Sequence, residues 1–289
     1  MRFSSLSEFL DKGGNALTRA PVALIFVEDL VEVESTIRYH QLTGFKSIVV
    51  FAPDELDLPA TLEQEVARVD FPVIDISDVQ TAVNACNDAA PDVWMYYCYN
   101  AEYLFFPFCE TRNVTELLTF HTEERRNAML AYVVDLYADD LGRYPNAVSL
   151  DHAWIDRSGY YALGRPDPAN RNHPKERQLD FFGGLRWRYE EHVARDRRKI
   201  DRVALFRTKK DLRLRADHTF TDEEYNTYAC PWHNNLTAAI ASFRTAKALK
   251  MNSGSTFDIP TFKWHNSVPF EWTSQQLLDL GLMEPGQWF

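Results

Sequence analysis

The sequence has few cysteines and no long hydrophobic run. Its four cysteines include no Cys-x-x-Cys pair, which argues against a zinc site and against a thioredoxin-type motif. The longest apolar stretches, such as residues 22–27, are too short to span a bilayer. Glu8, Asp11 and Lys12 interrupt any signal-peptide core. We therefore expect a cytoplasmic protein with free thiols, at Cys86, Cys98, Cys109 and Cys230.

Several familiar motifs are also missing. There is no Gly-x-x-x-x-Gly-Lys-Ser/Thr loop, no Gly-x-Gly-x-x-Gly turn, no His-Glu-x-x-His helix and no Gly-x-Ser-x-Gly elbow. This argues against P-loop, dinucleotide-cofactor, zincin and α/β-hydrolase chemistry. The chain has 31 basic residues (Lys and Arg) against 42 acidic residues (Asp and Glu), and its net charge is −11. Such a chain repels a phosphate backbone, so nucleic acid is not an expected partner, and any membrane contact would be peripheral.

The sequence does contain a regular alternation of apolar and amphipathic segments, after a lead-in at residues 1–20. Continuous apolar runs with β-branched members predict strands buried on both faces, and the segments between them have helical spacing. Gly44 is predicted to cap the first long helix. The pattern predicts βαβ units, and so an α/β fold with a mostly parallel sheet flanked by helices. The predicted strands are residues 21–27, 46–51, 71–76 and 93–98, and the predicted helices are residues 30–42, 61–69 and 79–87.

The second half of the chain is less regular. Residues 113–137 predict one or two helices, and residues 235–249 predict an amphipathic helix. The segment 142–174 is rich in Pro, Gly, Asn and Asp and predicts a long loop or lid. Residues 203–206 predict a strand.

Polar side chains stand where the predicted strands end. Ligands of open α/β sheets bind at the carboxyl ends of the strands. A carboxylate of Glu28 or Asp29 suits a base or a ribose, although Asp29 is more simply a helix cap. Glu102 suits a general base, or it holds its turn by accepting backbone N–H bonds. The predicted ends carry Glu28, Asp29, Asp54, Asp75, Tyr99, Asn100, Ala101 and Glu102.

A basic stretch follows the Gly183-Gly184 pair. Arginine forks match phosphate oxygens, so Arg186, Arg188 and Lys199 would neutralise a diphosphate without a metal. The simpler interpretation is a solvated strip that pairs with the acidic remainder of the chain.

Two histidines lie close to aromatic residues further along the chain. His218 would transfer a proton or contact a phosphate, and His233 follows Trp232, which would stack on a sugar. A structural histidine and a buried indole are the simpler alternatives.

The run from Trp94 to Leu104 is similar to a strand and metal-binding turn of GT-A glycosyltransferases, which use nucleotide sugars. In that turn, Asp-x-Asp holds a divalent cation, whereas the two ligand positions here are Tyr99 and Ala101. The order of several segments over most of residues 21–283 resembles the family 2-like glycosyltransferases of bacteria. The further segments are Val27-Glu28-Asp29, residues 38–44, Gly183-Gly184-Leu185-Arg186, Asp217-His218 and Trp232-His233.

The resemblance implies a GT-A-like domain. Residues 21–180 would form its nucleotide-sugar-binding part, and residues 181–289 its acceptor-side part with a helical and loop extension. Glu28, Asp29 and Asp54 would lie near the nucleotide, and the turn at Tyr99 would lie near the diphosphate. His218, Trp232 and His233 would approach from the C-terminal side.

The implied activity is transfer of a sugar from a UDP- or GDP-linked donor to a glycan or another hydroxyl acceptor. Tyr99 and Ala101 are not ligands for Mn²⁺ or Mg²⁺, so no metal ligand is assigned. The reaction would proceed without a metal, or Glu102 and His218 would hold a weaker ion. The alternative is a non-catalytic GT-A-like protein that binds a carbohydrate or a partner.

Overall fold

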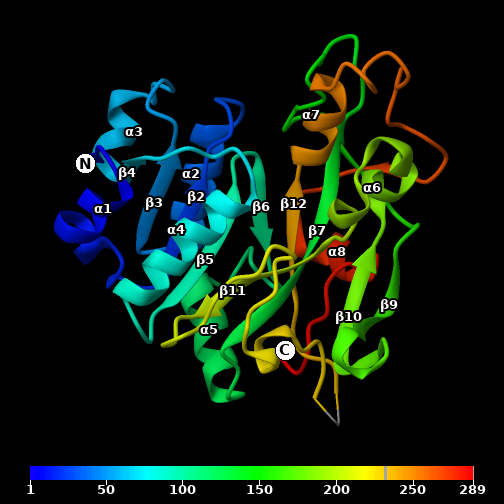
Figure 1. The fold of residues 1–289 in the computed structure, drawn as a ribbon. Helices are drawn as coiled ribbons and strands as arrows, with labels where there is room; N and C mark the ends of the chain where they lie inside the picture. Colours follow the sequence, from blue (N-terminus) through cyan, green and yellow to red (C-terminus); the bar gives the residue numbers. More distant parts are fainter. Residues whose placement is uncertain (231–232, 289) are drawn as a thin grey trace. The chain divides into compact units, whose positions relative to one another are not determined.

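The computed structural model describes residues 1–230 and 233–288 (Figure 1). It has an α/β fold with a large, mixed, mostly parallel sheet flanked by helices, as the sequence predicted. The chain divides into two compact units. Unit 1 comprises Met1–Tyr103, Cys109–Met129 and Val203–Asn226, and unit 2 comprises Leu104–Phe108, Leu130–Arg202 and Thr227–Phe289.

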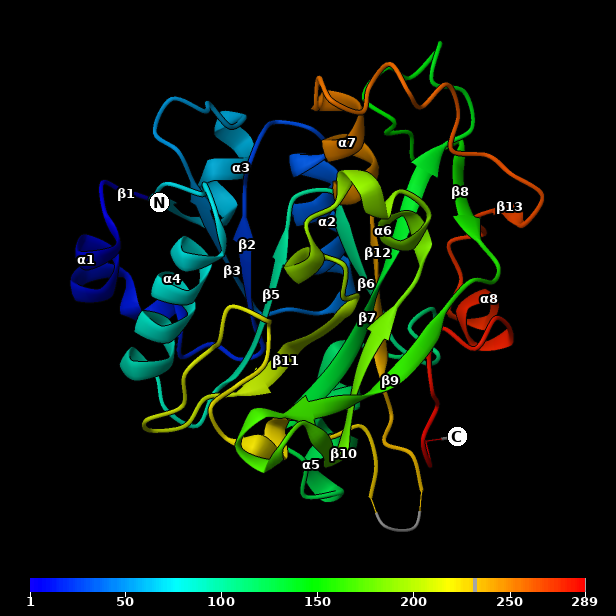
Figure 2. The same ribbon diagram turned by 45° about the vertical axis from the view of Figure 1, so that its right-hand side comes forward.

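Unit 1 is built on parallel strands in the order β1-β4-β3-β2-β5, with β11 antiparallel at β5. Helix α4 lies in front of these strands and α2 behind them (Figures 1 and 2). The strands are β1 Arg2–Phe3, β2 Val22–Phe26, β3 Ser47–Ala52, β4 Ala67–Asp70, β5 Trp94–Tyr99 and β11 Asp201–Arg207. The helices are α1 Leu6–Glu8, α2 Val33–Thr43, α3 Ala60–Glu65, α4 Ile76–Ala89 and α5 Val114–Glu123.

Local sequence explains most of these boundaries. Every residue of β2 and of β3 is buried, which matches their continuous apolar runs. Gly44 ends α2 at a φ of 105°, a left-handed conformation that glycine adopts without strain, and this confirms the predicted cap. Asp75 begins α4 through a capping box with Asp78, so it does not end a strand as predicted.

Unit 2 contains a parallel pair, β7 and β12, with β8 antiparallel to β7 and β13 antiparallel to β8. Strands β9 and β10 form a separate antiparallel hairpin. Tyr137, Leu185 and Phe262 belong to one buried cluster at its centre. The strands are β6 Glu102–Phe105, β7 Ala128–Ala138, β8 Ala153–Asp156, β9 Tyr161–Asp167, β10 His173–Phe182, β12 Ala238–Ser242 and β13 Ser267–Pro269. The helices are α6 Gly184–Arg188, α7 Arg244–Met251 and α8 Ser274–Asp279, and the unit boundaries fall inside β6, β7 and β11.

Several predictions of secondary structure were wrong. The predicted helix 113–137 ends at Glu123 and gives way to β7, and the predicted helix 235–249 is β12 followed by α7. A short apolar run suits a buried strand and a buried helix equally, so periodicity could not separate them. The predicted loop 142–174 contains β8 and β9. The third strand is Ala67–Asp70 instead of residues 71–76, so the predicted helix 61–69 is shorter and ends at Glu65.

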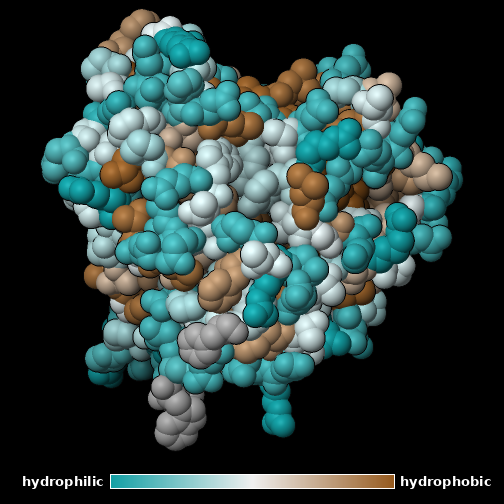
Figure 3. All heavy atoms as spheres, turned by 180° about the vertical axis from the view of Figure 1, so that it is seen from behind, coloured by the Kyte–Doolittle hydropathy of each residue, from teal (hydrophilic) through white to brown (hydrophobic). Residues whose placement is uncertain are grey.

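The surface seen from behind is mostly hydrophilic, with scattered apolar side chains (Figure 3). Among the described residues, no helix has both the length and the apolar character needed to cross a membrane.

Arg68 on β4 is a fully buried arginine that anchors the loop after β3. Its Nη2 donates to the carbonyls of Pro53 and Leu56 at 3.2 and 2.6 Å, and its Nη1 pairs with Glu63 at 2.5 Å. Its Nε also lies 3.4 Å from Asp70 Oδ1. A buried guanidinium with four partners holds a loop firmly, because its loss leaves desolvated polar groups behind.

We expect Arg68→Ala to lower the free energy of unfolding by about 3 kcal/mol, because it leaves two carbonyls and a carboxylate without their donor. Urea denaturation measures the change. The control is Arg38→Ala, which removes a solvent-exposed pair with Glu65 and should cost much less. Equal losses in the two variants would show that Arg68 does not anchor the loop.

Two histidines in unit 1 are buried in the neutral form. Burial lowers the pKa of His40 and of His121 to about 4. The ring of His40 stacks on Tyr96 with centroids 5.2 Å apart, and Nε2 of His121 lies 2.8 Å from the carbonyl of Ala128. Since the pKa in the unfolded chain is about 6.5, the unfolded state takes up protons first as the pH falls.

Stability from these histidines is therefore complete above about pH 6.5 and is lost as the pH falls towards 4. We expect each histidine to lower the free energy of unfolding at pH 5 relative to pH 7 by about 2 kcal/mol, partly offset by Asp201, whose raised pKa acts in the opposite direction. Denaturant titrations at the two pH values test this. The exposed His265 serves as the control, because His265→Ala should keep the same pH dependence.

Candidate functional site

The sheet of unit 1 has a topological switch point between β2 and β5. The chain proceeds from β2 to β3 and β4 on one side of β2, and β5 then pairs on the other side. All four strands are parallel, so their carboxyl ends share one edge. In open α/β sheets the ligand binds at the carboxyl ends beside the switch point. The residues there are those that follow Phe26 and Tyr99, which pair in register.

The side chain of Asn100 joins the two strand ends at the switch point. Its Oδ1 accepts from the N–H of Glu28 at 2.9 Å, and its Nδ2 donates to Asp29 Oδ1 and to the carbonyl of Val31 at 2.9 Å. Its backbone N–H donates to the carbonyl of Phe26 at 3.0 Å. The structure thus brings together Glu28, Asp29 and Asn100, three residues predicted from sequence to bind a donor.

Asp29 holds the loop after β2 but does not cap α2. Its Oδ1 also accepts from the N–H of Val31 at 2.9 Å. The N-cap position of α2 is Glu32, which has a φ of 55° and makes no side-chain cap. The helix starts later than the sequence predicted, which corrects the expectation of a cap at Asp29. Both Glu28 and Asp29 are partly exposed.

The turn between β5 and β6 is buried. Tyr99 is 2% exposed, and Asn100, Ala101 and Glu102 are fully buried. The N–H of Ala101 donates to Thr36 Oγ1 at 2.9 Å, and Ala101 has a φ of 60°. Glu102 Oε2 accepts from the N–H of Tyr99 at 2.9 Å. Glu102 therefore holds the turn, as the simpler alternative proposed.

His218 lies beside the carboxyl half of β5. Its Nδ1 is 3.0 Å from the hydroxyl of Tyr97, and the two rings stack with an interplanar angle of 19°. The carbonyl of His218 accepts from the N–H of Val203 at 3.0 Å. Because Leu205 pairs with Tyr96 and β11 runs antiparallel to β5, Val203 lies toward the end of β5. Thus His218 and Asn100 belong to the same end of one strand.

Three other residues predicted for the site are Asp54, Trp232 and His233. Asp54 follows β3 and is exposed, and its carbonyl accepts from Arg2 Nη2 at 3.1 Å. A hydrogen bond with Glu55 lowers the pKa of Asp54. His233 is partly buried in unit 2, where its carbonyl accepts from the N–H of Cys230 at 2.9 Å. Trp232 lies outside the described residues.

The three cationic residues predicted to meet a diphosphate all lie in unit 2, and each contacts a carboxylate of that unit. Arg186 Nε is 3.8 Å from Asp135 Oδ1, and Arg188 Nη1 is 3.1 Å from Asp156 Oδ2. Lys199 Nζ lies 3.0 Å from Asp180 Oδ2. They thus pair with acidic groups, as the simpler interpretation held, but both arginines are largely buried instead of forming a solvated strip.

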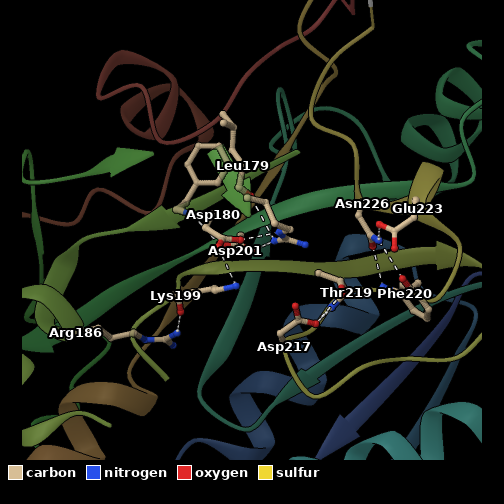
Figure 4. A network of polar contacts seen from close by, with 12 residues as sticks. Leu179, Asp180, Arg186, Lys199, Asp201, Asp217, Thr219, Phe220, Glu223 and Asn226 are labelled. Carbon is tan, nitrogen blue, oxygen red and sulfur yellow. Dashed lines mark hydrogen bonds and ion pairs between the residues drawn. The ribbon is translucent and has the colours of Figure 1, made fainter. Parts of the chain in front are cut away.

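Lys199 belongs to a compact ion cluster with Asp180, Asp201 and Arg165 (Figure 4). Arg165 Nε lies 2.6 Å from Asp180 Oδ1, and its Nη2 lies 2.5 Å from Asp201 Oδ2. Burial raises the pKa of Asp201 to about 6, and the charge of Arg165 partly opposes this. In unit 1, Figure 4 shows Asp217 bonded to Thr219 and Asn226 bonded to Phe220, contacts that fix the loop around His218.

Asp156 is the centre of a second buried cluster, which sequence reasoning missed. Its Oδ1 accepts from Trp264 Nε1 at 2.7 Å and from the hydroxyl of Tyr137. The guanidinium of Arg188 lies 4.6 Å from the ring centroid of Trp264. Nothing in the sequence marked Asp156, because it lies in the segment predicted as a loop.

Metal binding finds no support at these positions. Within residues 1–230 and 233–288, no three His, Cys, Asp or Glu side chains form a group that would hold a metal ion. No protein-family model matches the chain, and no curated protein matches it in sequence.

Replacing both Tyr99 and Ala101 by Asp tests whether the turn accepts a metal site. Burying two carboxylates should lower the free energy of unfolding by more than about 3 kcal/mol, so we expect a destabilised protein that Mn²⁺ does not rescue. Thermal unfolding with and without Mn²⁺ measures both effects, with Tyr99→Phe as the control. A folded double variant with manganese-dependent hydrolysis of a nucleotide sugar would contradict this expectation.

Proposed function

We propose that this protein is a glycosyltransferase of GT-A type that binds a nucleotide sugar at the switch point of unit 1 and transfers the sugar to a hydroxyl acceptor. The observation that carries the proposal is the joining of Glu28, Asp29 and Asn100 at the carboxyl ends of β2 and β5. The order of sequence segments that resemble family 2-like transferases supports the same choice.

The groups at this edge suit the nucleoside part of a donor. Carboxylates of Glu28 and Asp29 accept hydrogen bonds from ribose hydroxyls and from the N–H of a pyrimidine or purine base. Asn100 holds the backbone N–H of Glu28 and the carboxylate of Asp29, so this edge is arranged before the ligand arrives. A pre-organised site loses less side-chain freedom on binding.

The transfer step proceeds without a metal at Tyr99 and Ala101. His218, which is partly exposed beside the end of β5, is the group in unit 1 best placed to contact a phosphate or move a proton. Glu102 does not take this role in our proposal, because it is buried and bonded to the turn.

A second candidate, a non-catalytic GT-A-like carbohydrate-binding protein, is favoured by one observation. Each of the cations Arg186, Arg188 and Lys199 lies against an internal carboxylate. Pairing of this kind reduces the positive charge available for a departing diphosphate. Binding of a sugar without turnover of any donor distinguishes this candidate from the enzyme.

Calorimetric titration of the full chain with UDP, GDP and their hexose conjugates, with and without Mn²⁺, tests the proposal. We expect binding that does not need Mn²⁺. Glu28→Gln should weaken it at least about tenfold, which corresponds to about 1.4 kcal/mol, because a neutral amide is a poorer acceptor for ribose hydroxyls. Release of the nucleoside diphosphate on adding acceptor glycans measures transfer.

The matched control is Glu34→Gln on the exposed surface of α2, which should leave binding unchanged. If none of the nucleotides binds, the proposal fails. If a nucleotide sugar binds but is never turned over, the non-catalytic candidate holds.

A further inference from the structure

His218 and Tyr97 form a direct side-chain pair in unit 1. His218 Nδ1 lies 3.0 Å from the Tyr97 hydroxyl, and the two rings are nearly parallel with centroids 6.0 Å apart. Tyr97 is fully buried on β5, whereas His218 is partly exposed. The pair therefore joins a phenol that is inaccessible to water to an imidazole residue that solvent reaches.

The backbone holds His218 in a conformation that few residues other than glycine adopt. Its φ is 62°, in the left-handed region. Its N–H donates to the carbonyl of Arg215 at 3.1 Å, and its carbonyl accepts from the N–H of Val203 at 3.0 Å. Such conformations persist where neighbouring contacts enforce them, and they are concentrated at functional sites. Two backbone bonds and the contact with Tyr97 thus hold the imidazole in one place.

Tyr97 lies close to the edge that the proposed function assigns to the nucleoside. It precedes Asn100 by three residues along β5 and the turn that follows it, which is about 10 Å at the usual rise of a strand. A nucleoside diphosphate spans such a distance between its base and its outer phosphate. His218 is therefore within reach of phosphates attached to a nucleoside that Glu28 binds.

The chemistry of the two groups decides which one donates the hydrogen bond. A phenol gives up its proton more readily than a neutral imidazole N–H does, and an imidazole nitrogen is a stronger acceptor than a phenol oxygen. The Tyr97 hydroxyl therefore donates to Nδ1 of His218. In the neutral imidazole the single ring proton then lies on Nε2, so the ring offers a donor to a ligand.

We propose that Tyr97 is a positioning residue that fixes the Nε2–H tautomer of His218, so that His218 donates a hydrogen bond to a phosphate oxygen of the bound nucleotide. Ionised phosphate oxygens only accept, so a donor matches them, whereas a lone pair on Nε2 would repel them. The inference rests on the proposed function for the identity of the ligand. It assigns His218 to the phosphate and not to the removal of a proton from the acceptor hydroxyl.

Long-range ¹H–¹⁵N correlation spectra of the full chain, labelled with ¹⁵N-histidine, identify the tautomer at pH 8. The signal of His218 is the one that disappears in His218→Gln. We expect the Nε2–H form in the wild type and a mixture of the two tautomers in Tyr97→Phe, because phenylalanine has no hydroxyl to donate to Nδ1. A wild-type His218 that carries its proton on Nδ1 contradicts the inference.

Calorimetric titration with uridine, UDP, guanosine and GDP measures what the phosphates contribute. We expect the diphosphate to bind more tightly than its nucleoside. Tyr97→Phe should weaken the diphosphate about fivefold and leave the nucleoside unchanged, because only the contact of His218 with phosphate is disturbed.

Two replacements of His218 test the donor itself. His218→Asn tolerates the left-handed backbone but has no donor at the position of Nε2, so it should weaken the diphosphate about tenfold. His218→Gln places an amide N–H near that position and should restore part of the binding. Neither variant should change the affinity for the nucleoside.

Tyr225→Phe is the matched control. It also removes a buried tyrosine hydroxyl of unit 1, which donates to the carbonyl of Arg207 at 2.9 Å. Arg207 pairs with Trp94 at the amino end of β5, whereas the candidate site is at the carboxyl end. Tyr225→Phe should therefore bind nucleosides and diphosphates like the wild type.

Three binding results overturn the inference. They are a diphosphate that binds no more tightly than its nucleoside, wild-type binding of the diphosphate by Tyr97→Phe, or equal weakening of nucleoside and diphosphate by Tyr97→Phe, which would mean a structural role only. Each of them leaves the proposed nucleotide site standing. If no nucleoside and no diphosphate binds, the proposed function fails, and the tautomer of His218 decides by itself whether Tyr97 fixes the ring.

Discussion

The hydrogen bonds of Asn100 are the constraint on which the candidate site depends. One carboxamide accepts from the loop after β2 and donates twice back to it, while its own backbone N–H reaches Phe26. Because Asn100 is fully buried, none of these bonds competes with water. The ends of β2 and β5 are therefore joined into one edge, at which Asn100 holds the backbone of Glu28 and the carboxylate of Asp29.

Several ion pairs of the molecule are buried. A chain with a net charge of −11 places several of its arginines inside, opposite carboxylates. Arg165 between Asp180 and Asp201, and Arg188 against Asp156, are largely inaccessible to solvent. Removing one partner of such a pair leaves a desolvated charge, so these clusters make the packing around β10 and α6 intolerant of substitution.

Sequence reasoning predicted three strands of unit 1 and the end of α2 because local signals there agree. Strands β2, β3 and β5 are continuous apolar runs, and Gly44 marks the end of α2. It failed at β7 and β12, where the partner strand, and not the local pattern, decides between helix and strand.

The same division applies to the site. Glu28, Asp29 and Asn100 follow predicted strands, so their meeting was foreseeable. The cluster around Asp156 was not, because the sequence predicted a loop over residues 142–174.

The turn after β5 has a consequence for measurement. The N–H groups of Tyr99 and Ala101 are bound by side-chain oxygens, of Glu102 and Thr36, inside the protein. Amide protons held in this way exchange with deuterium slowly although they lie at a turn, where exchange is normally fast. The exchange rates of these two amides therefore report on the edge formed by β2 and β5 when a ligand is added. Faster exchange means that the edge opens, and slower exchange means that it tightens.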